Sequence, residues 1–141
     1  MKRIVILLIF VTSVCGTALT QEIEDSSRRT LGYIRGAGVV EDSSRRTLGY
    51  FEKDGTVEDH SRRTIGYIRS DGTVSDSSRR TKGYIRVNGE VEDSSRRTLG
   101  YIRSDGTVED SSRRTLGYAR GVRREYAAGF FFFFFRSAAD R

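Results

Sequence analysis

The stretch S-D-G-T-V-E-D-S-S-R-R-T-L-G-Y, residues 104–118, carries the pattern from which the fold of this 141-residue chain can be inferred. Its Gly-Tyr pair recurs every 17 residues without an insertion, from Gly32-Tyr33 to Gly117-Tyr118. The Arg-Arg pair and the aspartate before it keep the same spacing, so the unit occurs six times. A strict repeat of this kind predicts an object in which every copy occupies an equivalent environment.

Each copy is predicted to form a β-hairpin. The segments T-V-E-D and T-L-G-Y-I-R are short, rich in β-branched and aromatic residues, and bounded by turn residues. The Asp-Gly or Asn-Gly turn indicates a three-residue loop with glycine in the left-handed conformation. That loop length places Ile68 opposite Val74, which pairs apolar with apolar across the strands.

The second turn, S-S-R-R, is expected to be a four-residue loop, with Asp76 opposite Thr81 and Val74 opposite Gly83. These lengths reproduce the 17-residue period and keep both faces of the strands in phase. One face is then expected to carry Val, Ile and glycine, and the other Leu, Tyr, Glu and the arginine that ends the strand. A glycine in mid-strand indicates close backbone approach, so the six glycines suggest a crowded centre.

The two ends of the repeat array match, because Ile23 occupies the Val position and Ala119 the Ile position. An open array would leave two unpaired strand edges. We therefore expect an all-β fold in which 12 short strands close into a shallow symmetric barrel or flower-like ring.

The chain begins with the pattern of a secretory signal peptide. Lys2 and Arg3 precede an apolar run over residues 4–11, and small or polar residues follow. Cleavage is expected after Ala18 or Thr20. The apolar run is too short to span a bilayer, which needs about 20 residues.

The signal predicts a secreted or periplasmic protein, and Cys15 offers a lipoprotein anchor as the less favoured alternative. Without residues 1–20 the chain has no cysteine, which suits an extracytoplasmic protein that does not depend on disulfides. The expected domains are a signal peptide (1–20), the ring of six hairpins (21–120) and a C-terminal segment (121–141).

The C-terminal segment contains six consecutive phenylalanines, Phe130 to Phe135, after a short stretch that can form one or two helical turns. Two interpretations are open. The run can fill the centre of the ring as a core plug, because the hairpins otherwise lack large core residues. It can also insert into a bilayer interface as a foot for lipid contact, with Arg123, Arg124 and Arg136 reaching lipid phosphates. The candidate residues for either role are Phe130, Phe131, Phe132, Phe133, Phe134 and Phe135.

Tandem units of the form D-G-T-V-x-[DN]-S-S-x-x-T-[LI]-G-Y-I, the leading signal, the closing G-Y-A-R-G-V and the phenylalanine run resemble the 5-fold beta-flower proteins of bacteria. The resemblance extends from about Ile23 to Phe135. It implies a shallow β-barrel of hairpins with a hydrophobic C-terminal element, similar in outline to Tubby-like barrels. It implies no molecular role. Six copies, where the family has five, leave open whether the ring is six-fold or one terminal copy serves for closure.

Composition excludes several classes of site. The chain has 25 Lys+Arg, 19 Asp+Glu, no proline, and His60 as its only histidine. A zinc site needs three or four His, Cys or carboxylate ligands, and a catalytic triad would depend on His60 alone. The Asp-Gly turns lack the spacing of a calcium loop. We expect no cofactor, no metal and no enzymatic activity.

The Arg-Arg pairs are weak candidates for contact with an anion, since guanidinium groups bind phosphate and carboxylate well. The residues considered are Arg28, Arg29, Arg45, Arg46, Arg62 and Arg63. The favoured alternative is that each arginine faces an acid, as Glu58 and Asp59 suggest for one copy. The interleaved acids also argue against nucleic acid.

The repeated tyrosines can form a stacking belt for sugars, but packing across strands against Leu48, Ile65 and Leu99 is the favoured expectation. The sequence thus predicts a non-enzymatic exported β-repeat protein, a structural or binding module at the cell envelope. The alternative is a lipid- or membrane-surface-binding protein that uses the phenylalanine run. Membrane lipid or an anionic envelope component is the expected partner, and the oligomeric state stays open.

Overall fold

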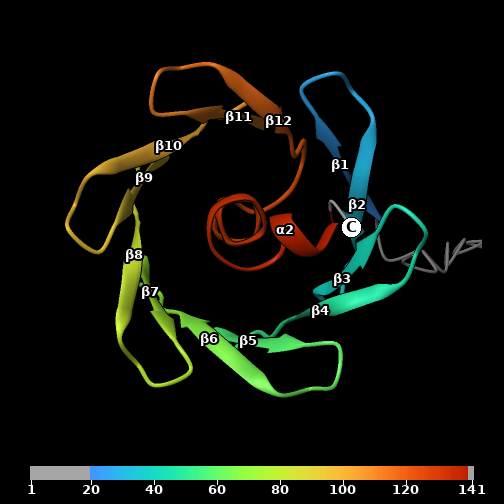
Figure 1. Cartoon of the computed structure of the whole chain (residues 1–141), viewed down its shortest axis with the longest axis horizontal. Helices are drawn as coiled ribbons and strands as arrows, with labels where there is room; N and C mark the ends of the chain where they lie inside the picture. Colours follow the sequence, from blue (N-terminus) through green and yellow to red (C-terminus); the bar gives the residue numbers. More distant parts are fainter. Residues whose placement is uncertain (1–19, 140–141) are drawn as a thin grey trace, which may run out of the picture.

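A computed structural model describes residues 20–139, which form a closed antiparallel ring of strands around a central helical segment (Figure 1). The predicted signal peptide and Cys15 fall on positions outside the described residues, apart from Thr20. The strands are β1 (Gln21–Asp25), β2 (Thr30–Ile34), β3 (Val39–Asp42), β4 (Thr47–Phe51), β5 (Thr56–Asp59), β6 (Thr64–Ile68), β7 (Thr73–Asp76), β8 (Thr81–Ile85), β9 (Glu90–Asp93), β10 (Thr98–Ile102), β11 (Thr107–Asp110) and β12 (Thr115–Tyr118). The predicted closed ring of 12 strands is confirmed.

The ring closes where β1 pairs with β12, and all six copies contribute a hairpin to it. Glu24 lies opposite Tyr118 at this seam, in the register that Glu41 and Tyr33 adopt inside the array. The Gln21 side-chain amide donates a hydrogen bond to the Gly121 carbonyl and fastens the two ends. The ring is therefore six-fold, because β1 and β12 pair at the seam in the same way as neighbouring copies pair elsewhere in the ring.

Two kinds of turn alternate around the ring. The inner turns join β2–β3, β4–β5, β6–β7, β8–β9 and β10–β11, and they have the predicted three-residue loop. Ile68 lies opposite Val74, the Arg69 N–H donates to the Thr73 carbonyl at 2.9 Å, and Gly72 has φ +89°. Only a residue without a β-carbon adopts that conformation without strain.

The petal turns join β1–β2, β3–β4, β5–β6, β7–β8, β9–β10 and β11–β12, and they splay outward from the ring (Figure 1). The predicted four-residue loop was wrong. The Asp76 N–H donates to the Arg80 carbonyl at 2.8 Å, and the Arg79 N–H donates to the Asp76 carbonyl at 3.0 Å. Asp76 therefore faces Arg80, not Thr81, and the loop has three residues like the inner turns.

The petal turn is short because the carboxylate of its aspartate accepts hydrogen bonds from backbone N–H groups of the same turn. Asp76 Oδ1 accepts the N–H groups of Ser78 and Arg80, both at 2.9 Å. Arg79 takes the left-handed position, at φ 65°, that glycine occupies in the inner turns. A side chain that binds nearby backbone N–H groups in this way stabilises a tight turn.

Because the loop is one residue shorter than predicted, the following strand contains one extra residue, which forms a β-bulge. Val74 lies opposite Gly83 as predicted, but Ser75 lies opposite Thr81, so Lys82 is the extra residue. An added residue shifts the alternation of side chains between the two faces. The equivalent Leu31 and Leu48 accordingly pack into or against the core, and the prediction that these leucines share the outer face with tyrosine was wrong.

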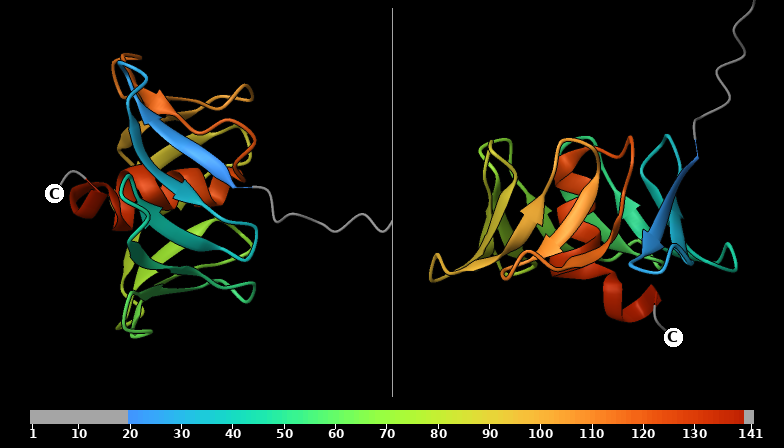
Figure 2. Two further views of the ribbon diagram at one scale, coloured as in Figure 1. Left: turned by 90° about the vertical axis from the view of Figure 1, so that its right-hand side faces the viewer. Right: turned by 90° about the horizontal axis from the view of Figure 1, so that it is seen from above.

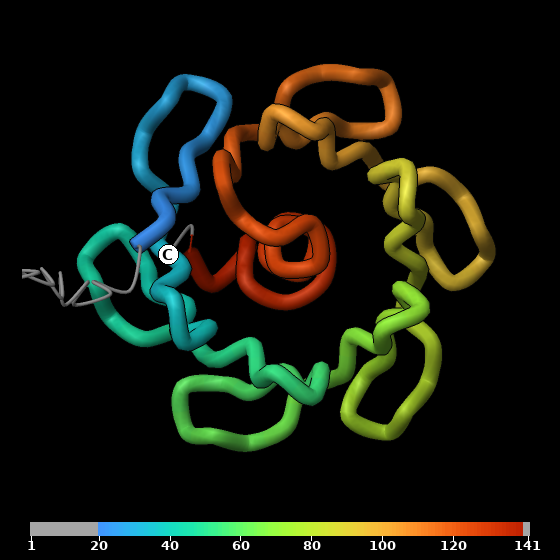
Figure 3. The backbone as a smooth tube through the Cα atoms, turned by 180° about the vertical axis from the view of Figure 1, so that it is seen from behind, coloured from blue at the N-terminus to red at the C-terminus, as the bar shows by residue number. Residues whose placement is uncertain are grey.

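The C-terminal segment turns inward after β12 and runs along the ring axis (Figures 2 and 3). It comprises α1 (Arg124–Ala128), the π-helix η1 (Gly129–Phe134) and α2 (Arg136–Ala139). α2 leaves the ring on the side where the petal turns splay outward, and β1 begins at the opposite side (Figure 2). Between the strands and this segment lies the core, where Val74 and its equivalents are fully buried.

Candidate functional site

The first arginine of every petal turn stacks on the tyrosine of the neighbouring copy. Arg45 lies 3.7 Å from the centroid of the Tyr33 ring, and Arg62 lies 3.6 Å from that of Tyr50. Arg28 makes the same contact with Tyr118 across the seam, at 4.3 Å. Cation–π contacts of this type contribute about 0.5–1 kcal/mol at exposed sites, which offsets part of the cost of left-handed arginine. The tyrosines therefore lie on the outer face beneath arginines, and their predicted packing against Leu48, Ile65 and Leu99 was wrong.

The second arginine of each pair forms an ion pair with the aspartate of its own turn. Arg63 Nε lies 3.2 Å from Asp59 Oδ2, and the Arg63 side chain is 78% exposed. Within residues 20–139 no further hydrogen bond or ion pair engages the terminal nitrogens of these arginines. The set comprises Arg29, Arg46, Arg63, Arg80, Arg97 and Arg114. Six guanidinium groups thus project from one rim with their outer donors unused.

The petal aspartates have pKa values below their ordinary value of 3.8. For Asp76, Asp93 and Asp110 the main cause is the hydrogen bond that the carboxylate accepts from the backbone N–H of the second arginine. A carboxyl group whose pKa is lowered by folding adds stability above its unfolded pKa, and that stability is lost as the pH falls through the lowered value.

The protein is therefore expected to be equally stable between pH 5 and pH 7 as far as these groups are concerned, and to lose stability below about pH 3.8. Urea midpoints measured from pH 7 to pH 2 test this. Replacing Asp76, Asp93 and Asp110 with Asn should lower the midpoint at pH 7 and flatten its acid dependence. An unchanged acid dependence in that triple variant would contradict the assignment.

A glutamate lies beneath the arginines on the outer face of most copies. Glu109 is 5% exposed; its Oε2 lies 3.5 Å from Arg103 Nη1 and its Oε1 lies 3.4 Å from Arg113 Nη1. The candidate anion-binding arginines are thus gathered on one rim but each faces a carboxylate or a tyrosine. This is the arrangement that Glu58 and Asp59 indicated, with Arg62 and Arg63 as their partners.

The phenylalanine run lies inside the ring, where five of its rings meet five mid-strand glycines, one from each of five copies. The pairs are Phe131 with Gly117, Phe132 with Gly100, Phe133 with Gly83, Phe134 with Gly66 and Phe135 with Gly49. A β-carbon on Gly83 would lie 2.8 Å from Phe133 Cε1, so glycine leaves the space that the ring fills. Phe130 is fully buried, whereas Phe132, Phe133 and Phe134 are partly exposed.

The π-helix brings the rotation per residue closer to the step that this one-to-one pairing requires. Successive phenylalanines reach successive hairpins, which are a sixth of a turn apart in a ring of six. An α-helix rotates by about 100° per residue, too much for that step. Hydrogen bonding from i to i+5 widens the helix and reduces the rotation per residue. In the remaining sector, that of Gly32, the chain leaves the ring and α2 contacts β3.

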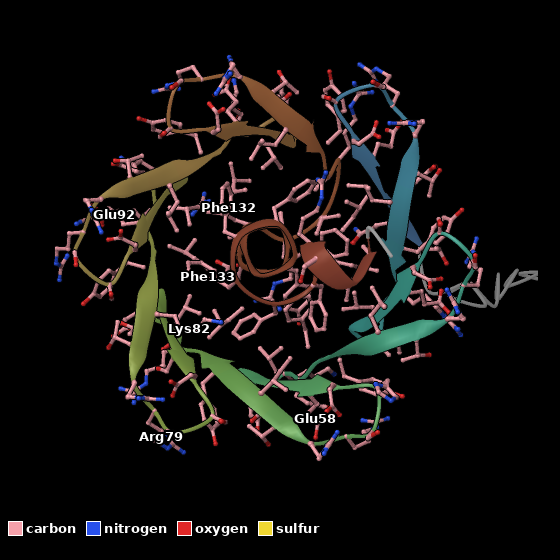
Figure 4. All side chains as sticks on the ribbon, viewed as in Figure 1. Glu58, Arg79, Lys82, Glu92, Phe132 and Phe133 are labelled. Atoms are coloured by element: carbon pink, nitrogen blue, oxygen red, sulfur yellow. The ribbon has the colours of Figure 1, made fainter. Side chains whose placement is uncertain are left out.

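Two departures from the repeat adapt the ring to the central segment, and neither contact was predicted from the sequence. Phe51 replaces the usual isoleucine, stacks on Tyr126 at 4.6 Å between centroids, and meets Phe135 edge-on. Lys82 replaces the usual leucine, and its Nζ donates to the Phe133 carbonyl at 2.9 Å (Figure 4). Burial lowers the pKa of Lys82. Both residues could be noticed in the sequence, because each differs from the residue that most other copies carry at the same position of the repeat.

Residues 20–139 hold no group of three or more His, Cys, Asp or Glu side chains placed to bind a metal ion. In the same part of the chain, no helix has the length and apolar character that crossing a membrane requires.

Comparison with known proteins assigns the chain to a family. A family model described as 5-fold beta-flower protein matches residues 20–135, which is most of the chain and covers the ring and the phenylalanine run. No curated protein and no solved structure matches. The ring found here has six hairpins, although the family description says five-fold. The protein belongs to the 5-fold beta-flower family.

Proposed function

We propose that this protein is a non-enzymatic exported module that docks by its petal rim on an anionic component of the cell envelope. The observation that carries the proposal is the set of six guanidinium groups on one rim whose outer N–H groups have no partner among the described residues. Planar guanidinium groups bind phosphate and carboxylate oxygens in pairs. Six of them in a ring favour a surface or polymer with repeated negative charge.

The central segment supports docking by arginine over docking by phenylalanine. Phe130, Phe131 and Phe135 are buried against the ring, so inserting them into a bilayer would empty the core. The partly exposed Phe132, Phe133 and Phe134 keep the lipid-binding alternative open, because a shallow contact could add to the arginine rim.

Absence of an enzymatic role is part of the proposal. The polar side chains of the rim recur in nearly equivalent sets, such as Arg103, Glu109 and Arg113. General acid–base chemistry needs two groups whose surroundings push their pKa values apart, and a repeated rim offers little such asymmetry.

Vesicle co-sedimentation of the chain without residues 1–20 tests the rim. An arginine adjacent to an anionic membrane contributes about 1 kcal/mol, and salt screens this attraction. We expect binding to vesicles with phosphatidylglycerol, no binding to pure phosphatidylcholine, and release by about 1 M NaCl. Binding that survives high salt would indicate insertion of phenylalanine instead.

Substitutions on the two sides of the ring test which surface binds the vesicles. Replacing Arg63, Arg80 and Arg97 with Gln should weaken binding at least about tenfold, which corresponds to 1.4 kcal/mol. Lys53→Gln serves as the control, since Lys53 lies exposed in an inner turn on the other side of the ring. A soluble polyanion added as competitor separates lipid from polymer: retention on vesicles in its presence favours lipid. Equal binding by the triple variant and the control would overturn the rim proposal.

Export has its own test. Cell fractionation of the full chain should place the protein outside the cytoplasm, shortened by about 18–20 residues. Full-length protein in the cytoplasmic fraction would contradict the proposed location.

A further inference from the structure

The outer face of the ring repeats a carboxylate cradle, defined by two arginines, a tyrosine and the glutamate between them. In the copy with Glu109, the arginines are Arg103 and Arg113, and Arg113 stacks on Tyr101 at 3.7 Å. Glu41 is held in the same way, with Arg35 Nη1 at 3.4 Å and Arg45 Nη1 at 3.7 Å. The carboxylate in each cradle is almost completely buried.

One copy keeps the cradle but lacks its carboxylate. Ser75 stands where the other copies carry a glutamate, 34 residues before Glu109. The backbone register is unchanged, because Tyr67 lies opposite Ser75 as Tyr101 lies opposite Glu109. Arg79 stacks on Tyr67 at 4.3 Å, and Arg69 is retained at the strand end.

The two arginines of this cradle have no ion-pair partner among the described residues. The acid closest in sequence to Arg69 is Asp71, and Asp71 accepts the Thr73 N–H at 2.9 Å. Its pKa is lowered chiefly by that hydrogen bond and to a smaller extent by Arg69. The preceding copy has an extra acid, Glu52, but this residue does not replace the missing carboxylate, because it forms an ion pair with Arg62 at 2.9 Å.

The missing group has a definite size and charge. Serine keeps the β-carbon of glutamate and places a hydroxyl where glutamate has its γ-carbon, so the lost part is a single carboxylate. The Ser75 residue itself is 2% exposed. Two guanidinium groups without an ion-pair partner, beside a serine where the other copies carry a glutamate, favour an anion that accepts hydrogen bonds from both.

We propose that the Ser75 cradle is a binding site for the carboxylate of a small organic acid, which takes the place of the absent glutamate side chain. Arg69 and Arg79 donate to its two oxygens, as Arg103 and Arg113 do to Glu109. Formate matches the missing group, whereas the methyl group of acetate would point toward Ser75, into the space where glutamate has its γ-carbon and serine its hydroxyl. The site uses none of the six second arginines of the petal turns, although Arg79 lies in the same turn as Arg80.

Titration of the full chain without its signal with sodium formate and sodium acetate tests the site. The ionic strength is held constant with NaCl, and backbone amide shifts of Ser75 and Tyr67 are followed by NMR. We expect one saturable site in the wild-type protein with a dissociation constant of about 1 mM. Shifts that grow linearly, or that NaCl alone reproduces, would overturn the proposal.

The repeat supplies two matched variants. Ser75→Glu restores the residue of the other copies, so it should fold normally and weaken formate binding at least about tenfold. Glu109→Ser should create a second site and raise the stoichiometry from one to two. If Glu109→Ser does not fold, Glu92→Ser replaces it, since Arg86 holds Glu92 in the equivalent position. Formate binding that is unchanged by Ser75→Glu would refute the assignment.

Discussion

Replacing Phe130 with alanine is expected to lower the free energy of unfolding by about 3–5 kcal/mol, the usual cost of removing a buried aromatic ring. The Phe130 side chain is fully buried and packs edge-on against Phe131, with ring centroids 5.4 Å apart. Small domains have about 5–15 kcal/mol of total stability, so this single change removes a large share of it. Urea unfolding followed by circular dichroism measures the effect.

Val87→Ala is the control for that experiment. Val87 is 88% exposed in an inner turn, and a surface substitution of this type changes stability by no more than about 0.5 kcal/mol. If Phe130→Ala behaved like this control, the phenylalanine run would not be the core of the ring. The lipid-foot interpretation would then regain support.

Gly83→Val is expected to destabilise the protein by about 3 kcal/mol or more, at or above the upper end of the usual cost of overpacking. A β-carbon at this position would lie 2.1 Å from the Glu92 carbonyl oxygen and 2.8 Å from Phe133 Cε1. One neighbour is the backbone of the adjacent strand and the other is the central helix, so neither side offers room. Thermal and urea unfolding measure the loss.

A double-mutant cycle separates the two clashes. Gly83→Ala should cost less in a Phe133→Ala background, because the ring that meets the new methyl group is gone. The same glycine substitution in a Phe131→Ala background should cost as much as in the wild type, since Phe131 lies against Gly117. Equal coupling of Gly83 to both phenylalanines would contradict the pairing of one ring with one copy.

The candidate site was partly predictable. The arginine–acid pairing in the petal turns followed from Glu58 and Asp59 lying close in sequence to Arg62 and Arg63. The stacking of Arg45 on Tyr33 did not, because the two residues are 12 positions apart and meet only when neighbouring hairpins pair. The contacts of Phe51 with Tyr126 and of Lys82 with the Phe133 carbonyl did not follow either, because both join a hairpin to the central segment.

The amino-acid sequence alone determined the hairpins, the inner turns and the closure of the ring, because an uninterrupted period and Asp-Gly turns are local features that every copy repeats. The bulge that turns the leucines inward was not predicted, although it follows from a local contact, in which the Asp76 carboxylate accepts two backbone N–H groups of its own turn. Tertiary structure alone decided which phenylalanine meets which glycine. That match depends on the rotation of the central π-helix relative to the number of hairpins around it, and no single copy contains both.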